Sequence, residues 1–180
     1  MISRKKIYKD KVIKQLVDKY KYKSIMQVPR IEKIVINRGM GEAISNSKVI
    51  ELTTTLFQKI AGQKPVVTKA KKSISNFKLR KGQPVGCMVT LRSHKMYDFI
   101  TKLIDLVLPK MRDFRGVSTK SFDKDGNYTL GLKDETIFPE VNFERVDRIR
   151  GMNITFVINS GSKEESYDLL RFIGMPFRKD

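Results

Sequence analysis

The sequence predicts an α+β protein with a mainly antiparallel sheet, helices packed on one face of that sheet and a long basic loop between two strands. Short segments alternate apolar and polar residues with the period of a strand, and longer segments between them carry apolar residues at helical spacing. Because each strand is apolar on one side only, we expect one covered and one open sheet face. At 180 residues the chain is most simply a single domain, 1–180.

The first part of the chain is expected to fold as helix, strand and helix. Residues 7–20 place apolar side chains on one helical stripe, and Pro29 follows them. Residues 31–41 form a strand in which Ile34 and Ile36 face the core, and Gly39 and Gly41 end it. The next helix begins after Ser45 or Ser47, ends at Gly62 and buries one stripe: Val49, Leu52, Leu56, Phe57 and Ile60.

A basic stretch occupies the middle of the chain. The segments VVTKA (66–70) and VGCMVTL (85–91) are typical of strands, and residues 71–84 between them are too long for a tight turn. From Glu51 to Asp98 no acidic residue intervenes, whereas ten positions are basic: Lys59, Lys64, Lys69, Lys71, Lys72, Lys78, Arg80, Lys81, Arg92 and Lys95. Unrelieved like charge repels itself, so we expect a polyanion to neutralise this mobile loop. The alternative is a solvated basic loop without a partner.

The last part of the chain adds two helices and two strands. A helix capped by Ser93 carries its apolar stripe from Met96 to Val107 and ends at Pro109. Residues 128–133 and 152–159 alternate as strands; 110–127 is irregular, and a short helical turn is expected within 142–150. Ser162 and Glu165 have the spacing of a capping box, and Gly174 stops the final helix.

The open sheet face is expected to be a polar surface. The residues that alternate with the apolar ones are mostly Asn, Thr, Lys and Arg. Such amides and hydroxyls can bond phosphate oxygens, ribose 2′-hydroxyls and base edges. An ordinary solvated sheet face is the alternative, but the charge of the chain argues for RNA.

The net charge of +18, from 37 basic and 19 acidic residues, indicates a nucleic acid or an anionic membrane as partner. A membrane is the weaker option, because no apolar run approaches the roughly eighteen residues needed to span one. The positive N-terminus has no apolar core behind it, so no secretory signal is expected. The one cysteine, Cys87, fits a reducing compartment, and a cytoplasmic location follows.

An enzyme is not expected. With His94 as the only histidine and Cys87 as the only cysteine, the chain lacks the ligands for a zinc site, and we expect neither metal nor other cofactor. Cys87 falls on the core side of its strand, where an inert thiol is expected. Gly39-Met-Gly41 is a weak glycine signal that is better explained as the end of a strand.

Several long motifs carry a family resemblance. These are MQVPRIEKIVINRGMGEA, AGQKPVVTKAKKSISNFKLRKGQPVGCMVTLR, PKMRDFRG, KSFDKDGNY, IFPE, VDRIRGMNIT and PFRK. Over residues 8–179 the chain resembles the 5S-rRNA-binding family of the bacterial large ribosomal subunit, large-subunit ribosomal protein five. The resemblance implies an α+β structural protein of the central protuberance. Its implied partners are 5S rRNA, large-subunit rRNA, P-site tRNA, a small-subunit head protein and neighbouring 5S-associated ribosomal proteins.

The resemblance also implies roles for residues. The 5S rRNA-binding surface would include Lys14, Asn37, Gln63, Lys64, Thr90 and Arg92. The tRNA-binding loop, 71–84, would act through Lys71, Lys72, Ser73, Phe77, Lys78, Arg80 and Lys81. The intersubunit bridge would lie around residues 112–115 and 134–150, with Arg112, Arg115, Arg145 and Arg148 as its basic members.

Two other functional classes remain open at the level of sequence. A non-ribosomal RNA-binding regulator would share the charge and the polar face, but it would leave large subunits easily in a salt wash. An RNA-processing enzyme would need a metal or a general base, which the shortage of histidine and clustered carboxylates disfavours.

Overall fold

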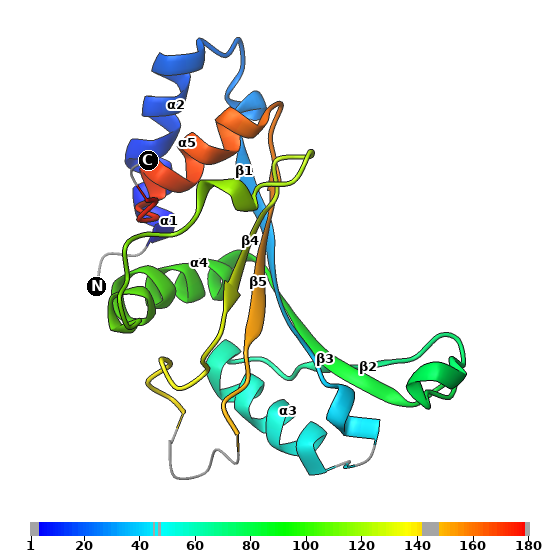
Figure 1. Cartoon of the computed structure of the whole chain (residues 1–180). Coiled ribbons are helices and arrows are strands. Elements are labelled where there is room, and N and C mark those ends of the chain that lie inside the picture. The colour runs from blue at the N-terminus through cyan, green and yellow to red at the C-terminus, as the bar shows by residue number, and fades with distance from the viewer. Residues whose placement is uncertain (1–3, 45, 47, 142–147, 179–180) are drawn as a thin grey trace. The chain divides into compact units, whose positions relative to one another are not determined.

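The computed structural model describes residues 4–44, 46, 48–141 and 148–178 (Figure 1). Its residues gather into two compact units. The first unit comprises Met1–Ile34, Arg92–Leu130 and Thr155–Asp180, and the second comprises Val35–Leu91 and Gly131–Ile154. Each unit is described by itself below.

Five strands form one antiparallel sheet in the order β2-β3-β1-β5-β4. The strands are β1 (Arg30–Gly39), β2 (Val66–Lys69), β3 (Pro84–Leu91), β4 (Tyr128–Leu132) and β5 (Met152–Asn159). With the helices described below, this confirms the predicted α+β class.

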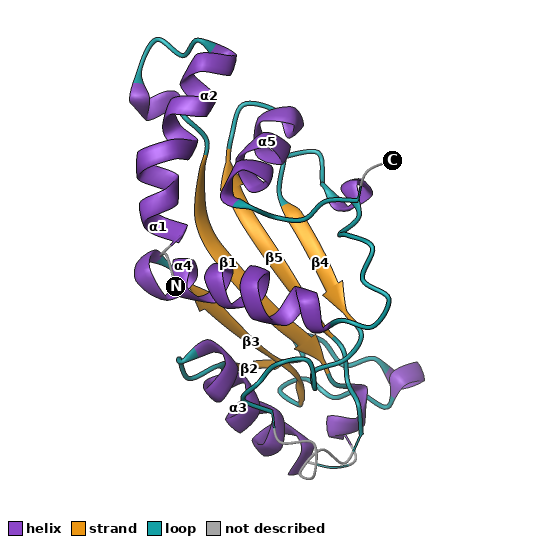
Figure 2. Cartoon of the chain, turned by 90° about the vertical axis from the view of Figure 1, so that its left-hand side faces the viewer, coloured by secondary structure: helices purple, strands orange, loops and turns teal. Residues whose placement is uncertain are grey.

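The first unit contains the N-terminal, central and C-terminal helices. The N-terminal helix is α1 (Arg4–Ile7), a π-helical segment (Tyr8–Val12) and α2 (Ile13–Tyr20). The central helix is α4 (Ser93–Lys102), continued by a π-helical segment (Leu103–Val107) and a 3-10 turn (Leu108–Lys110); α5 spans Lys163–Ile173. Figure 2 shows α4 and α5 on the same side of the strands. Their apolar stripes are buried with strand residues such as Phe156.

The ends of these helices can be compared with the capping and stop residues predicted from the sequence. Ser162 accepts a hydrogen bond from the Glu165 backbone, and the Glu165 side chain accepts one from the Gly161 N–H at 3.0 Å, so the capping prediction is confirmed. The helix stops at Gly174 with φ +109°. The predicted cap at Ser93 is wrong, because Ser93 is the first helical residue and the N-cap position falls on Arg92. Pro109 also lies within the last 3-10 turn instead of ending the helix before it.

The second unit contains α3 (Lys48–Ala61), which packs against β3, and a 3-10 turn at Gly41–Ile44. Gly62 follows α3 with φ +63°, which confirms the predicted stop. The predicted apolar stripe is partly wrong: Leu52 is 50% exposed, and Thr53 is buried in its place. The stripe that reaches the core runs through Val49, Thr53, Phe57 and Ile60, at helical spacings of three and four.

Part of the segment 142–150 lies outside the described residues. The short helical turn expected there falls mostly on residues 142–147, which the structure does not describe. The three residues that follow, 148–150, are not helical and lead into β5.

Candidate RNA-binding surface and basic loop

The strands β4 and β5 have one buried and one open side, as predicted. In β4, Tyr128, Leu130 and Leu132 are buried, whereas Thr129 and Gly131 between them are exposed. The same alternation holds along β5, where Ile154, Phe156 and Ile158 are buried. The polar face is therefore a property of the folded strands as well as of the sequence pattern.

Polar side chains on the open side of the first unit bond to one another. The hydroxyls of Thr129 and Thr155 lie 3.1 Å apart across β4 and β5, and the Asn159 amide donates to Glu32 at 3.3 Å. A threonine hydroxyl offers one donor and two acceptor lone pairs, so these pairs keep capacity for a further partner.

Four of the six residues predicted to bind 5S rRNA belong to the second unit. Asn37 on β1 and Thr90 on β3 are half-buried, on neighbouring strands and on the side away from the buried Ile36 and Val89. The Gln63 side chain donates a hydrogen bond to the Thr90 carbonyl at 3.1 Å, which ties the residues after α3 to β3. Lys64, the next residue, is exposed. The structure thus brings Gln63, Lys64 and Thr90 together and places Asn37 on the adjoining strand.

The other two predicted 5S contacts belong to the first unit. Lys14 lies on α2 and is exposed, and Arg92 occupies the N-cap position of α4 and is also exposed.

The basic loop connects the two strands of a hairpin. Val66 pairs with Met88 and Lys69 pairs with Pro84 in antiparallel register. Pro84, which we predicted as the end of the loop, is therefore the first residue of β3. The loop runs from 70 to 83 and extends beyond the paired strands (Figure 1). All seven predicted tRNA-binding residues in it are exposed: Lys71, Lys72, Ser73, Phe77, Lys78, Arg80 and Lys81.

The loop has an internal hydrogen-bonded framework that the sequence pattern did not indicate. Ile74 and Leu79 exchange two backbone hydrogen bonds, of 2.8 and 3.1 Å, around a 3-10 turn at Ser75–Phe77. The Ser73 hydroxyl accepts from the Lys81 N–H at 3.0 Å. These bonds satisfy backbone groups within the loop. The basic side chains are exposed, and Phe77 is 71% exposed at the tip.

The predicted bridge residues fall in different parts of the chain. Arg112 and Arg115 are exposed and belong to the first unit. Arg148 belongs to the second unit, is 71% exposed and forms an ion pair with Glu42 at 2.6 Å. Arg145 lies outside the described residues.

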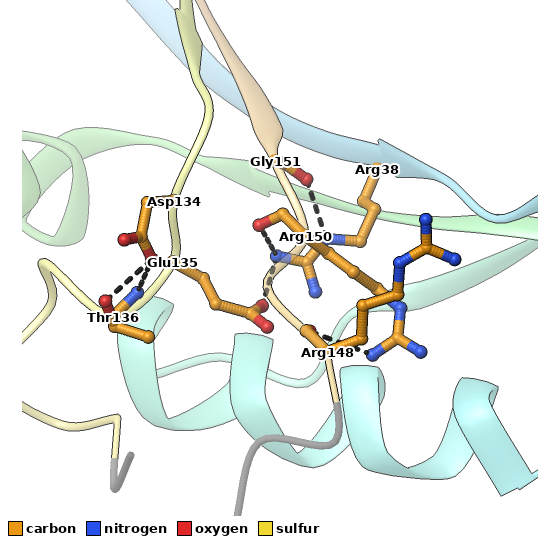
Figure 3. A network of polar contacts seen from close by, with 7 residues as sticks. All are labelled: Arg38, Asp134, Glu135, Thr136, Arg148, Arg150 and Gly151. Carbon is orange, nitrogen blue, oxygen red and sulfur yellow. Dashed lines mark hydrogen bonds and ion pairs between the residues drawn. The ribbon is translucent and has the colours of Figure 1, made fainter.

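A buried ion pair joins Arg38 and Glu135, two residues that no sequence pattern brings together (Figure 3). Both side chains are 3% exposed. The Arg38 guanidinium also donates to the Gly151 carbonyl at 2.9 Å and lies over the Phe57 ring, 5.1 Å from its centroid. Asp134 accepts two hydrogen bonds of 2.7 Å from Thr136, which hold the turn that carries Glu135. The alternation of the strand could have indicated this burial, because residues 34, 36 and 38 point to the same face and Ile34 and Ile36 face the core.

Cys87 is buried at 1% exposure, on the core side as predicted. Burial raises the pKa of its thiol to about 11, and the charge of Arg38 lowers it in part. The thiol is consequently protonated at neutral pH, the form that does not act as a nucleophile. His94 has a different environment, with its Nε2 3.1 Å from the Lys5 amine.

Neither metal ligands nor membrane spans are found in the described part of the chain. Within residues 4–44, 46, 48–141 and 148–178, no three His, Cys, Asp or Glu side chains gather into a metal-binding group. In the same ranges, every helix is too short or too polar to cross a membrane.

Two family models match the chain in succession. The model described as "Ribosomal protein L5" matches residues 24–80, and the model of the C-terminus of the same ribosomal family matches residues 84–177. Together with the basic surface and the polar sheet face, these matches define the class: a ribosomal protein, which is a structural constituent of the ribosome and not an enzyme.

Curated relatives narrow the class to one family. The chain is 54% identical over 173 residues to large ribosomal subunit protein uL5 of Clostridium acetobutylicum, with 96% of each chain covered. It is 53% identical to uL5 of Geobacter sulfurreducens, with 97% of each covered, and 56% identical to uL5 of Heliobacterium modesticaldum, with 92% of each covered. The chain belongs to the ribosomal protein L5 family, whose bacterial members are named uL5. It is thus a protein of the large ribosomal subunit, which in bacteria lies in the cytoplasm.

Proposed function

We propose that this chain binds 5S rRNA through the open sheet face and helps to attach it to the large-subunit rRNA in the central protuberance. The observation that carries the proposal is the half-buried polar surface around Asn37, Gln63 and Thr90, next to the acid-free basic stretch. Lys14, Lys64 and Arg92 supply charge for phosphate contacts.

The chemistry divides between charge and hydrogen bonding. Lysine and arginine contacts to phosphates release counterions and supply affinity for any RNA. Asn37 and Thr90 can bond base edges and 2′-hydroxyls, which differ between RNA sequences and shapes. Discrimination between 5S rRNA and other RNA is therefore assigned to the sheet face, and bulk affinity to the basic residues.

Asn37→Ala and Thr90→Ala are expected to reduce discrimination between 5S rRNA and an unrelated structured RNA. Each lost hydrogen bond leaves a buried RNA partner unpaired, at about 1–3 kcal/mol. Filter-binding titrations over a range of salt concentrations measure both affinities. The salt dependence, about 0.7–0.9 log units per log salt for each neutralised phosphate, should not change. Thr55→Ala, at an exposed threonine of α3, is the matched control. Equal losses for both RNAs would refute the assignment of the sheet face.

The basic loop is proposed to contact the P-site tRNA. Its support is the outward direction of Lys71, Lys72, Lys78, Arg80 and Lys81 from a loop whose backbone is bonded within itself. Phosphate contacts of this kind are weak singly and strongly salt-dependent together. Phe77 at the tip can stack on a base or lie against a ribose.

An intersubunit bridge to a small-subunit head protein is proposed at Arg112 and Arg115. These two exposed arginines follow the central helix, whereas Arg148 is engaged by Glu42. Arg112→Gln combined with Arg115→Gln is expected to weaken subunit association modestly, because exposed charge pairs contribute about 0–1 kcal/mol each. Sucrose-gradient sedimentation of purified subunits measures it, with Lys120→Gln as control. Unchanged association across magnesium concentrations would argue against this surface.

A further inference from the structure

A pocket of about 240 Å³ opens in the second unit where β1 ends, α3 begins and the chain enters β5. Its lining includes Gly39, Gly41, Glu42, Val49, Arg148 and Arg150. We refer to it as the arginine pocket. No sequence motif predicts a ligand here: Gly39 and Gly41 are predicted to end a strand, and Arg148 is predicted to belong to the intersubunit bridge.

Two arginines on the rim of the arginine pocket share one carboxylate. Arg148 Nη1 lies 2.6 Å from Glu42 Oε1, and Arg150 Nη2 lies 3.1 Å from Glu42 Oε2. The side chains of Arg148 and Glu42 are 71% and 48% exposed, so solvent competes for this pairing. An exposed pair such as Arg148–Glu42 contributes about 0–1 kcal/mol, so a stronger anion can displace Glu42 from Arg148. The Arg150 side chain is more sheltered, at 20% exposure.

The base of the pocket is rigid. The buried Arg38 guanidinium donates to the Gly151 carbonyl at 2.9 Å and to the Arg150 carbonyl at 3.2 Å. Figure 3 shows that the Arg38 nitrogen that donates to the Arg150 carbonyl also pairs with Glu135. The backbone that carries Arg150 is thus fixed before any ligand arrives, which lowers the entropy cost of binding.

Two of the three glycines that line the pocket, Gly39 and Gly41, are not required by crowding or by backbone conformation. A Cβ at Gly86 would meet the Arg38 carbonyl oxygen at 2.5 Å, and one at Gly151 would meet the Leu132 carbonyl oxygen at 2.6 Å, so crowding requires those glycines. A Cβ at Gly39 or Gly41 would meet nothing within 4 Å, and neither residue has a positive φ. Their bare backbone leaves room for close approach by a group from outside the chain.

We propose that the arginine pocket binds a phosphate of an RNA strand, with Arg148 and Arg150 turned from Glu42 to the phosphate and the attached ribose over Gly39 and Gly41. Arginine forks match the oxygens of a phosphate, and the net charge of +18 favours a polyanion. The inference rests on the proposed function only in that the ligand is RNA. Its site is separate, because Arg38 points to the side of β1 that α3 covers.

The test titrates the protein with a short single-stranded oligouridylate and, separately, with inorganic phosphate, and follows the NMR amide signals of Gly39, Gly41 and Gly151. We expect saturable shifts with both probes. Arg148→Gln should weaken oligonucleotide binding about tenfold, the loss of one charge-assisted contact. Gly41→Ala should weaken it by steric exclusion alone, with an unchanged melting temperature.

Glu42→Gln gives the sharpest outcome, because removing the competing carboxylate should strengthen oligonucleotide binding. Glu51→Gln removes the same charge from an exposed position of α3 and controls for net charge. Equal gains in Glu42→Gln and Glu51→Gln, or full affinity in Gly41→Ala, would overturn the site. An oligoglutamate peptide that shifts the same amides at lower concentration than the RNA would overturn the choice of ligand. Asn37→Ala and Thr90→Ala could leave the discrimination between 5S rRNA and other RNA unchanged while the oligonucleotide still shifts the amide signals of Gly39, Gly41 and Gly151. In that case the sheet-face proposal fails and the proposal for the arginine pocket stands.

Discussion

Glu135→Leu is expected to lower the free energy of unfolding by about 3–5 kcal/mol, because it strands the buried Arg38 charge without a partner. Leucine is close to glutamate in volume, so the loss reports charge and not a cavity. Both members of the pair are 3% exposed, and water cannot take the place of the missing carboxylate. Urea unfolding followed by circular dichroism measures the change.

Matched variants separate the ion pair from its surroundings. Adding Arg38→Met to Glu135→Leu should recover part of the loss, since a buried ion pair and an apolar pair are often similar in stability. Recovery should be incomplete because the carbonyls of Arg150 and Gly151 lose their donor, at about 1–3 kcal/mol each. Glu51→Leu, on the exposed side of α3, should stay within about 0.5 kcal/mol. A loss below about 1 kcal/mol for Glu135→Leu would mean that Arg38 is not buried with its charge.

Replacing residues 71–82 with a short Gly/Ser turn is expected to abolish most of the contribution of the loop to P-site tRNA retention. The melting temperature and the 5S rRNA affinity should change little. The hydrogen bonds of the loop join its own residues, so its removal leaves the β2–β3 register intact. Ala70 and Gln83, which bond across the base of the loop at 2.8 Å, are kept to close the hairpin. Retention is measured on reconstituted ribosomes by filter binding of P-site tRNA.

A second variant separates the effect of the charge of the loop on tRNA retention from the effect of its shape. Changing Lys71, Lys72, Lys78, Arg80 and Lys81 to glutamine keeps the fold of the loop and removes its charge. It should reproduce most of the loss of tRNA retention at low salt and less of it at high salt. Phe77→Ala isolates stacking, worth about 1–3 kcal/mol per base where it occurs. If 5S rRNA affinity collapses while tRNA retention holds, the loop is an anchor to rRNA, and the proposed division of roles is wrong.

Local patterns predicted most elements because each depends on neighbours in sequence. The capping box at Ser162 and the stops at Gly62 and Gly174 follow from short-range chemistry, and all three are found. Local patterns could not predict which side of α3 is exposed. Leu52 and Thr53 are adjacent, and which of them faces the core depends on how the helix packs on its strand. The capping signal at Ser93 failed for another reason: Ser93 takes a left-handed conformation, with φ +52°, and the N-cap position falls on Arg92, which makes no side-chain capping bond.

The amino-acid sequence by itself determined the α+β class, the two-sided strands, the exposed basic loop and, through its long motifs, the ribosomal family. The spacing of apolar residues and the distribution of charge can be read from the sequence, and the fold buries the apolar residues that this spacing places on one face. Only the tertiary structure decided that Arg38 pairs with Glu135 and that Glu42, Arg148 and Arg150 meet beside two unexplained glycines. The partners in each ion pair lie about a hundred residues apart in sequence. A local sequence pattern cannot predict such a pair, because the partners come close only when the strands pair and a helix packs on them.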